Sequence, residues 1–301
     1  MQKLMLALDW TPNINHIGFF VAQHKGFYKK HGVEVTISDP SEDNYAVTPA
    51  KKVELGFADL ALCPTESILS YRTKSATFSM IAIAAILQED LSAIAVRADS
   101  NIISPKDLDG QSYASYKARY EDKMVMQMMK NDGGKGDLLV EYPNKLGIWE
   151  TLTKEKYKST WIFTNWEGVE AEQMGIDLRL FRMKDYQIPY SYSPVIAINE
   201  QQINKHSDAF KSFLKASKEG FMYSVKNPDE ATAILRGLLP KKDKSIDLLK
   251  ALERTSTSFG TSKTWGKMDE KVVSNFLDWI YENNLEEQKL DVSDLITNIL
   301  N

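Results

Sequence analysis

The sequence predicts an α/β protein built from two lobes. Its 301 residues are 43% hydrophobic and 26% charged, and at roughly 150 residues per domain the chain is long enough for two separate cores. Short apolar runs alternate with segments of helical periodicity, which is typical of βαβ units and a largely parallel sheet. This alternation restarts after Ser104, which indicates that a second lobe is inserted into the first.

The first part of the chain gives the clearest alternation. Helical spacing of apolar side chains predicts a helix from Phe19 to Lys30, closed near Gly32. The other helices are expected at Ala46 to Lys51 and Glu66 to Thr73. Strands are expected at Lys3 to Leu8, Val33 to Ile37, Leu55 to Leu62, Met80 to Leu87 and Ser92 to Val96.

The inserted lobe repeats the pattern and then returns the chain to the first lobe. Its expected strands are Ser112 to Ser115, Leu138 to Glu141 and Trp161 to Phe163, and its helices are Asp122 to Met129, Gly147 to Thr153 and Gly168 to Met174. The return leads into a strand at Val195 to Asn199 and four helices, expected at Ala209 to Val225, Asp229 to Leu238, Asp247 to Arg254 and Asp269 to Asn283.

This pattern predicts a discontinuous lobe I, residues 1–96 plus 191–301, and an inserted lobe II, residues 97–190. The two crossings, near 94–98 and 188–193, would form a hinge beside a cleft. Ligands in open α/β sheets lie outside the carboxyl ends of the strands. Functional side chains are therefore expected in the loops that follow strands.

Composition excludes several classes of protein. Lys+Arg total 37 against Asp+Glu 41, a net charge of −4, whereas nucleic-acid binding needs clustered positive charge. The single cysteine, Cys63, excludes intrachain disulfides and cysteine-ligated metal clusters. No apolar run approaches the roughly 18–20 residues of a membrane span. The opening residues favour a strand over an export signal, so a cytoplasmic location is expected. The alternative, if a leader has been removed, is a periplasmic or lipid-anchored protein that works with a transporter.

The known catalytic motifs are missing from the sequence. There is no phosphate loop, dinucleotide-binding glycine pattern, serine nucleophile elbow or zinc-protease motif. Gly133 to Gly136 indicates a turn, and the four histidines have no metal-ligand spacing. We therefore expect no catalytic residue, no metal and no cofactor, and a binding protein rather than an enzyme.

The strand-end loops are rich in side chains suited to recognising a small molecule. Aromatic rings can sandwich a flat ligand, acids can accept hydrogen bonds from its amines, and amides can read its ring nitrogens. Lys117 and Arg119 offer an alternative anion site. The candidate ligand-binding residues are Trp10, Asn15, His16, Asn44, Tyr45, Thr65, Glu66, Ser115, Tyr116, Lys117, Asn165, Trp166, Glu167 and Tyr192.

Each candidate also has an ordinary structural explanation. Trp10 would serve equally as a core anchor, His16 as a hydrogen-bonding residue at a helix start, and Glu66 as a carboxylate favoured by the helix dipole. Asn165, Trp166 and Glu167 are the strongest functional candidates, because an amide, a large ring and an acid rarely share one strand end only for packing.

Several segments resemble one known family. They are Leu8 to Val35, Val53 to Asp59, Ser104 to Gly110, Asn165 to Glu167 and Pro194 to Asn199. The chain resembles the thiamine-pyrimidine group of periplasmic-binding-protein-like proteins, which contains both solute-binding proteins and a pyrimidine synthase. The resemblance implies a type II periplasmic-binding-protein fold, with mixed, mainly parallel sheets around the ligand cleft.

The departures from the synthase pattern favour a binder. The resemblance implies that the synthase has a lysine that holds pyridoxal phosphate and a histidine that its own reaction consumes. At the corresponding positions this chain has Cys63 and Ser67. Neither residue can form a Schiff base. We expect a protein that binds a thiamine-pyrimidine-like heteroaromatic by lobe closure. The alternatives are an enzyme of thiamine biosynthesis that uses His16 or Glu66, and a sulfonate- or nitrate-type anion binder.

Overall fold

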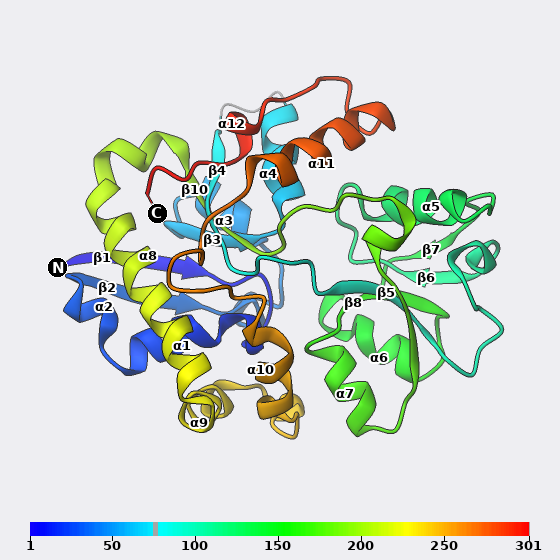
Figure 1. Ribbon diagram of the computed structural model, residues 1–301, viewed down its shortest axis with the longest axis horizontal. Coiled ribbons are helices and arrows are strands. Elements are labelled where there is room, and N and C mark those ends of the chain that lie inside the picture. Colours follow the sequence, from blue (N-terminus) through cyan, green and yellow to red (C-terminus); the bar gives the residue numbers. More distant parts are fainter. Residues whose placement is uncertain (75–77, 301) are drawn as a thin grey trace. The chain divides into compact units, whose positions relative to one another are not determined.

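The computed structural model describes residues 1–74 and 78–300, which form two compact units (Figure 1). Unit 1 comprises Met1–Asp90, Ser191–Leu277 and Gln288–Asn301, and unit 2 comprises Leu91–Tyr190 and Asp278–Glu287. The chain therefore crosses between the units four times, whereas the sequence analysis expected two crossings.

Unit 1 is built on a mixed five-stranded sheet of order β2-β1-β3-β10-β4. Its strands are β1 (Gln2–Ala7), β2 (Val33–Ser38), β3 (Leu60–Cys63), β4 (Met80–Ala85) and β10 (Val195–Asn199). β1 runs parallel to β2 and β3, and β10 is antiparallel to β3 and β4. The carboxyl ends of β1, β2 and β3 consequently meet at one edge of the sheet.

The helices of unit 1 hold this sheet in an apolar core. They are α1 (Ile17–His24), α2 (Phe27–Lys30), α3 (Pro49–Glu54), α4 (Thr65–Thr73), α8 (Ile203–Lys226), α9 (Pro228–Leu238), α10 (Leu248–Ser256), α12 (Val292–Leu295) and the first part of α11 (Glu270–Glu282). The Phe19 ring on α1 lies 6.0 Å from Phe213 and 5.1 Å from Phe221, both on α8. At the same contact, a Cβ on Gly220 would lie 2.0 Å from the Gly18 carbonyl oxygen. The two helices therefore pack backbone to backbone.

Unit 2 has a second mixed sheet, of order β7-β6-β8-β5-β9. Its strands are β5 (Ser92–Arg97), β6 (Ser112–Ala114), β7 (Leu139–Glu141), β8 (Ser159–Phe163) and β9 (Leu178–Phe181), and its helices are α5 (Glu121–Asn131), α6 (Ile148–Thr153) and α7 (Glu167–Gln173). Trp149, Leu152 and Ile162 form part of its core. The two sheets confirm the predicted α/β class.

The division between the units differs from the predicted one in two places. β5 belongs to unit 2 because it pairs with β8 and β9. Residues 278–287 also belong to unit 2, where the Glu286 carboxylate pairs with the Arg119 guanidinium at 2.6 Å. A helix pattern alone cannot show that the end of α11 contacts a different unit from its beginning.

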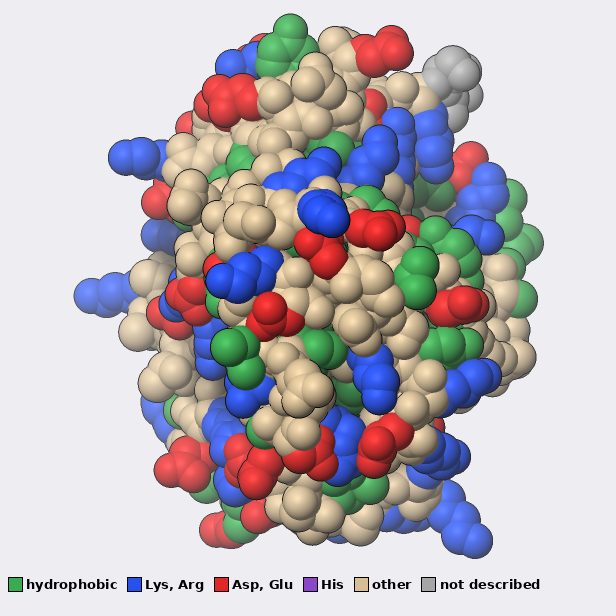
Figure 2. Space-filling model, turned by 90° about the vertical axis from the view of Figure 1, so that its right-hand side faces the viewer, with side chains coloured by type: hydrophobic (Ala, Val, Ile, Leu, Met, Phe, Trp, Pro, Cys, Tyr) green, Lys and Arg blue, Asp and Glu red, His purple; other side chains and the backbone are tan. Residues whose placement is uncertain are grey.

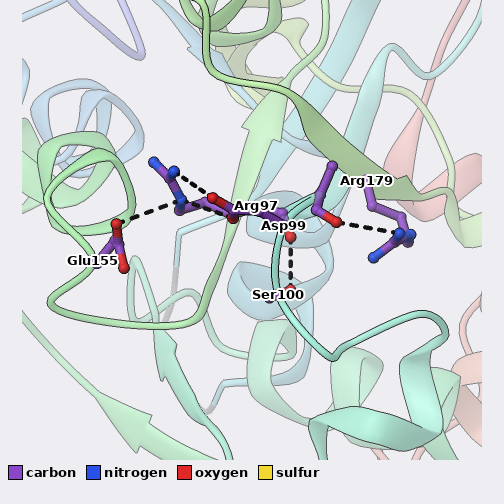
Figure 3. Close-up of polar contacts among 6 residues, drawn as sticks. Arg97, Asp99, Ser100, Glu155 and Arg179 are labelled. Atoms are coloured by element: carbon purple, nitrogen blue, oxygen red, sulfur yellow. Dashed lines mark hydrogen bonds and ion pairs between the residues drawn. The ribbon is translucent and has the colours of Figure 1, made fainter.

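The turn after β5 is held by a group of polar contacts within unit 2 (Figure 3). Arg97 pairs with Asp99 at 2.7 Å and with Glu155 at 3.8 Å, and the Ser100 hydroxyl donates to the Arg97 carbonyl at 2.6 Å. Arg179 donates to the carbonyl oxygens of residues 98 and 102. These guanidinium groups are engaged by carboxylates and carbonyls of the chain itself, so the group stabilises the turn.

Several elements differ from the sequence expectation for local reasons. The strand expected from Leu55 to Leu62 begins only at Leu60, because α3 runs to Glu54 and Gly56 then turns the chain with a φ of 73°. The helix predicted from Phe19 to Lys30 is divided into α1 and α2 at Gly26, whose φ of 73° is left-handed. β9 (Leu178–Phe181) was not predicted, because it is only four residues long and its first three side chains, which include Arg179, are half-buried, so that Phe181 alone is buried. On the face shown in Figure 2, basic and acidic side chains are interspersed.

Candidate functional site

The loop between β1 and α1 holds a carboxylate in a fixed position. The buried His16 ring accepts a hydrogen bond from the Asn13 backbone N–H at Nδ1, 3.3 Å away. Its Nε2 lies 2.8 Å from Asp9 Oδ1. Because Nδ1 is an acceptor, Nε2 carries the ring proton and donates it to Asp9. His16 therefore orients the Asp9 carboxylate, which remains 21% exposed.

Two aromatic rings lie beside this carboxylate. The Trp10 and Tyr45 ring centroids are 5.8 Å apart, with an interplanar angle of 55°. Tyr45 and its neighbour Asn44 both have a left-handed backbone, with φ of 58° and 52°. This conformation is uncommon for residues other than glycine and points to a positional requirement. Burial raises the pKa of the Tyr45 hydroxyl, and the negative charge of Asp9 raises it further.

The end of β3 adds a thiol and a second acid to the same sheet edge. Cys63 is 3% exposed and Glu66, in the first turn of α4, is 5% exposed. Burial raises the pKa of the Cys63 thiol, and the charges of Asp9 and Glu66 raise it further. The thiol is therefore protonated at neutral pH and is not an activated nucleophile. Asp9, Tyr45, Cys63 and Glu66 thus form one electrostatically coupled group.

A buried hydroxyl lies in the same β1–α1 loop. Thr11 is 4% exposed, and its Oγ1 has no hydrogen-bond partner within residues 1–74 and 78–300. Buried hydroxyl groups are normally satisfied, so this hydroxyl is available to a ligand. The candidates chosen from the sequence include neither Thr11 nor Asp9, although both lie in the loop that was singled out after the first strand. The signal available for Asp9 was its place directly after β1, seven residues before His16.

Several sequence candidates in unit 1 have structural roles. The Thr65 hydroxyl donates to the Tyr192 carbonyl at 2.6 Å, and the Tyr192 hydroxyl accepts from the Asp269 backbone N–H at 2.9 Å. These contacts attach the chain before β10 to α4 and to the segment before α11. The Asn15 backbone N–H donates to the Asn13 side chain at 2.9 Å, which caps the start of the helix.

In unit 2, the loop after β6 is filled by its own carboxylate. Glu121 is 2% exposed and accepts from the backbone N–H groups of Tyr116 at 3.0 Å and Ala118 at 3.2 Å, and from the Tyr113 hydroxyl at 2.7 Å. Burial raises the Glu121 pKa, and these hydrogen bonds oppose that shift. The Lys117 backbone N–H donates to Ser115 Oγ at 2.9 Å. The donors that would hold an external anion are thus used within the loop.

The cations of the alternative anion site are also engaged. Arg119 pairs with Glu286 at 2.6 Å, and Glu286 also accepts from the Tyr120 hydroxyl. The Lys117 ammonium lies 5.5 Å from the centre of the Tyr142 ring. These contacts weaken the sulfonate or nitrate alternative.

The strand-end triplet Asn165, Trp166 and Glu167 is buried in unit 2. Their exposed fractions are 0%, 4% and 8%. Glu167 begins α7 and accepts from the Phe163 backbone N–H at 3.0 Å, which closes the turn between β8 and the helix. Glu167 therefore has a structural role in unit 2, and the contribution of the triplet to ligand binding stays a prediction.

Metal and membrane signals are both missing from the part of the chain that the structure describes. No group of three or more histidine, cysteine or acidic side chains is placed to hold a metal ion there. Within the same residues, no helix is long and apolar enough to cross a bilayer.

The model of the family described as NMT1/THI5 like matches residues 13–231. The chain belongs to this NMT1/THI5-like family. It is 22% identical over 307 residues to the formylaminopyrimidine-binding protein of Halalkalibacterium halodurans, a match that covers 99% of this chain and 91% of that protein. It is also 21% identical over 237 residues to a 4-amino-5-hydroxymethyl-2-methylpyrimidine phosphate synthase of Legionella pneumophila, covering 78% of this chain and 73% of that protein.

A solved structure shows the same fold. A Candida albicans protein described as having the generic periplasmic-binding-protein fold superposes with a TM-score of 0.71 at 15% identity, covering 99% of this chain and 97% of that one. The family resemblance and the fold predicted from the sequence are thereby confirmed.

Proposed function

We propose that this NMT1/THI5-like protein binds a small heteroaromatic molecule of the thiamine-pyrimidine type at the β1–β2–β3 edge of unit 1. The observation that carries the proposal is the Trp10–Tyr45 ring pair beside the Asp9 carboxylate that His16 orients. A flat ring packed against these aromatics gains apolar burial and stacking. An amino group on that ring can donate to Asp9 in a charge-assisted hydrogen bond. The free Thr11 hydroxyl supplies a further polar contact.

The relatives support this class of ligand. The Halalkalibacterium halodurans relative is named for binding a formylaminopyrimidine, and the Legionella pneumophila relative for making an aminopyrimidine phosphate. Both names contain an aminopyrimidine, which combines a flat ring with an exocyclic amine. That combination matches an aromatic pair beside a carboxylate.

A binding role is favoured over catalysis. Cys63 and Ser67 occupy the positions at which the synthase resemblance implies a lysine and a histidine. Burial keeps the Cys63 thiol protonated by raising its pKa, and a Schiff base requires an amine. Stacking and satisfied hydrogen bonds are sufficient for a binder.

The test is calorimetric titration of the full chain with 4-amino-5-hydroxymethyl-2-methylpyrimidine. We expect Trp10→Ala to weaken binding by about tenfold or more, because it removes one face of the ring contact. Phe57→Ala is the matched control, since Phe57 is also an aromatic residue of unit 1 but is 66% exposed. A folded Trp10→Ala protein that binds as tightly as wild type would contradict the proposal.

A further inference from the structure

We infer that Ser191 is a specificity-determining residue of the unit 1 site, and that its hydroxyl bonds a hydroxyl substituent on the ligand ring. The inference rests on the proposed function and adds the part of the ligand that the site distinguishes. It is carried by a second buried hydroxyl without a partner, besides that of Thr11, at the same edge of the unit 1 sheet.

The Ser191 side chain is buried without a hydrogen bond. It is 2% exposed, and within residues 1–74 and 78–300 its Oγ has no hydrogen-bond partner. Two other buried serines of unit 1 are satisfied, because Ser217 Oγ lies 3.0 Å from the Tyr28 hydroxyl and Ser224 Oγ donates to the Gly220 carbonyl at 2.8 Å. A buried hydroxyl without a partner costs free energy and is rare in native proteins. A ligand that bonds Ser191 would remove this cost.

Ser191 is held at the sheet edge that carries Asp9. β10 is antiparallel to β3, and β3 is parallel to β1, so β10 begins where β1 and β3 end. The segment before β10 is fixed there, because the Tyr192 carbonyl accepts from the Thr65 backbone N–H at 3.1 Å and from its hydroxyl at 2.6 Å. Ser191 directly precedes Tyr192, whereas Asp9 follows β1. Two separate segments of the chain thus bring these side chains to one edge.

The chemistry of Ser191 suits a hydroxyl on the ligand. The Asp9 carboxylate can only accept, and it meets the amino group of the ring. Ser191 comes from a different segment, so it is placed for a substituent elsewhere on that ring. A serine hydroxyl both donates and accepts, and a ligand hydroxyl matches both capacities. A methyl group in its place would leave Ser191 unpaired, and sites built on such a hydrogen bond reject the analogue that lacks it.

The experiment compares two pyrimidines by calorimetric titration of the full chain. The probes are 4-amino-5-hydroxymethyl-2-methylpyrimidine and 4-amino-2,5-dimethylpyrimidine, which differ by one hydroxyl. Wild type should bind the hydroxymethyl probe about 5- to 100-fold more tightly, because the dimethyl probe leaves a buried hydroxyl unpaired. Ser191→Ala should lose most of this preference, because the hydroxyl of the first probe then lacks its partner.

Ser224→Ala is the matched control. Ser224 is also a fully buried serine of unit 1, but its hydroxyl is bonded within α8. This variant should keep the wild-type preference while lowering the Tm of the ligand-free protein. Ser191→Ala removes no internal hydrogen bond, so it should leave that Tm unchanged or raise it. A purely structural role for Ser191 would lower it.

The outcomes separate the inference from the proposed function. A Ser191→Ala protein that keeps the wild-type preference, or that loses as much stability as Ser224→Ala, would overturn the inference and leave the proposed function standing. Equal affinity of wild type for the two probes would do the same. A wild-type chain that binds neither probe would contradict the proposed function itself.

Discussion

At the scale of single residues, each unit contains a carboxylate held by hydrogen bonds, half-buried at Asp9 in unit 1 and buried at Glu121 in unit 2. Asp9 is held by His16 at an edge of the unit 1 sheet and keeps part of its surface exposed. Glu121 is enclosed by the donors of its own loop. The first can meet a ligand donor, whereas the second completes the fold of unit 2.

We predict that Glu121→Ala lowers the free energy of unfolding by roughly 2–4 kcal/mol, because it leaves buried donors without an acceptor. These donors are the backbone N–H groups of Tyr116 and Ala118 and the Tyr113 hydroxyl. Urea denaturation followed by circular dichroism measures the change. Glu141→Ala, an exposed acid on β7, is the control and should change stability by less than about 0.5 kcal/mol. Equal stability of the two variants would contradict this role for Glu121.

Of the unit 1 group, Trp10, Tyr45 and Glu66 were singled out from the sequence, because they lie in the loops that follow β1, β2 and β3. Their role in ligand binding stays a prediction. It could not show that Glu121 is a structural carboxylate. That role depends on the loop conformation, in which Lys117 has a φ of 61° and two backbone N–H groups face the same side chain. Hydrophobic periodicity carries no information about such a loop.

At the scale of elements, the contact between α1 and α8 sets the packing of unit 1. Gly18 and Gly220 let the two backbones approach closely beneath the Phe19, Phe213 and Phe221 rings. The sequence predicted both helices, but it could not predict that the two glycines face each other, since 202 positions separate them in the chain.

We predict that Gly220→Ala destabilises the protein by about 1–3 kcal/mol or more, because its Cβ would lie 2.0 Å from the Gly18 carbonyl oxygen. Gly237→Ala is the matched control on α9, where an added Cβ meets nothing within 4 Å. Since alanine is the better helix former, Gly237→Ala should raise stability by about 0.5–1 kcal/mol. Thermal or urea unfolding of both variants measures the difference, and a neutral Gly220→Ala would contradict the close packing.

We predict that Asp109, through its hydrogen bonds to the loop after α5, makes a pH-dependent contribution to the free energy of unfolding. Asp109 accepts from the backbone N–H groups of Lys135 at 2.6 Å and Asp137 at 2.8 Å, and these bonds lower its pKa. The stabilisation is therefore complete above the usual aspartate pKa of about 3.9 and is lost as the pH falls through the lowered folded value. Asp109→Asn should lower the urea midpoint at pH 7 and make much less difference near pH 2.5. The exposed Asp137→Asn serves as the control, and a difference between wild type and Asp109→Asn that persists in acid would contradict the account.

At the scale of the whole molecule, the family and the two-sheet architecture were predictable from the alternation of elements and from the segment that begins at Leu8. The four crossings between the units were not. Residues 278–287 return to unit 2, where Glu286 pairs with Arg119, and no local pattern in the sequence marks this return. No local pattern shows which unit β5 belongs to either. Its place in unit 2 follows from its pairing with β8 and β9.

The measurement that tests the central claim most directly is a thermal-shift panel on the purified chain. The panel contains 4-amino-5-hydroxymethyl-2-methylpyrimidine, a taurine-like sulfonate and nitrate. A ligand at 100 times its Kd adds about 2.7 kcal/mol to stability, which raises the Tm by a few degrees in a protein of this size. The account predicts this shift with the pyrimidine and none with the two anions. A shift with sulfonate or nitrate and not with the pyrimidine, or no shift with any of the three, would contradict it.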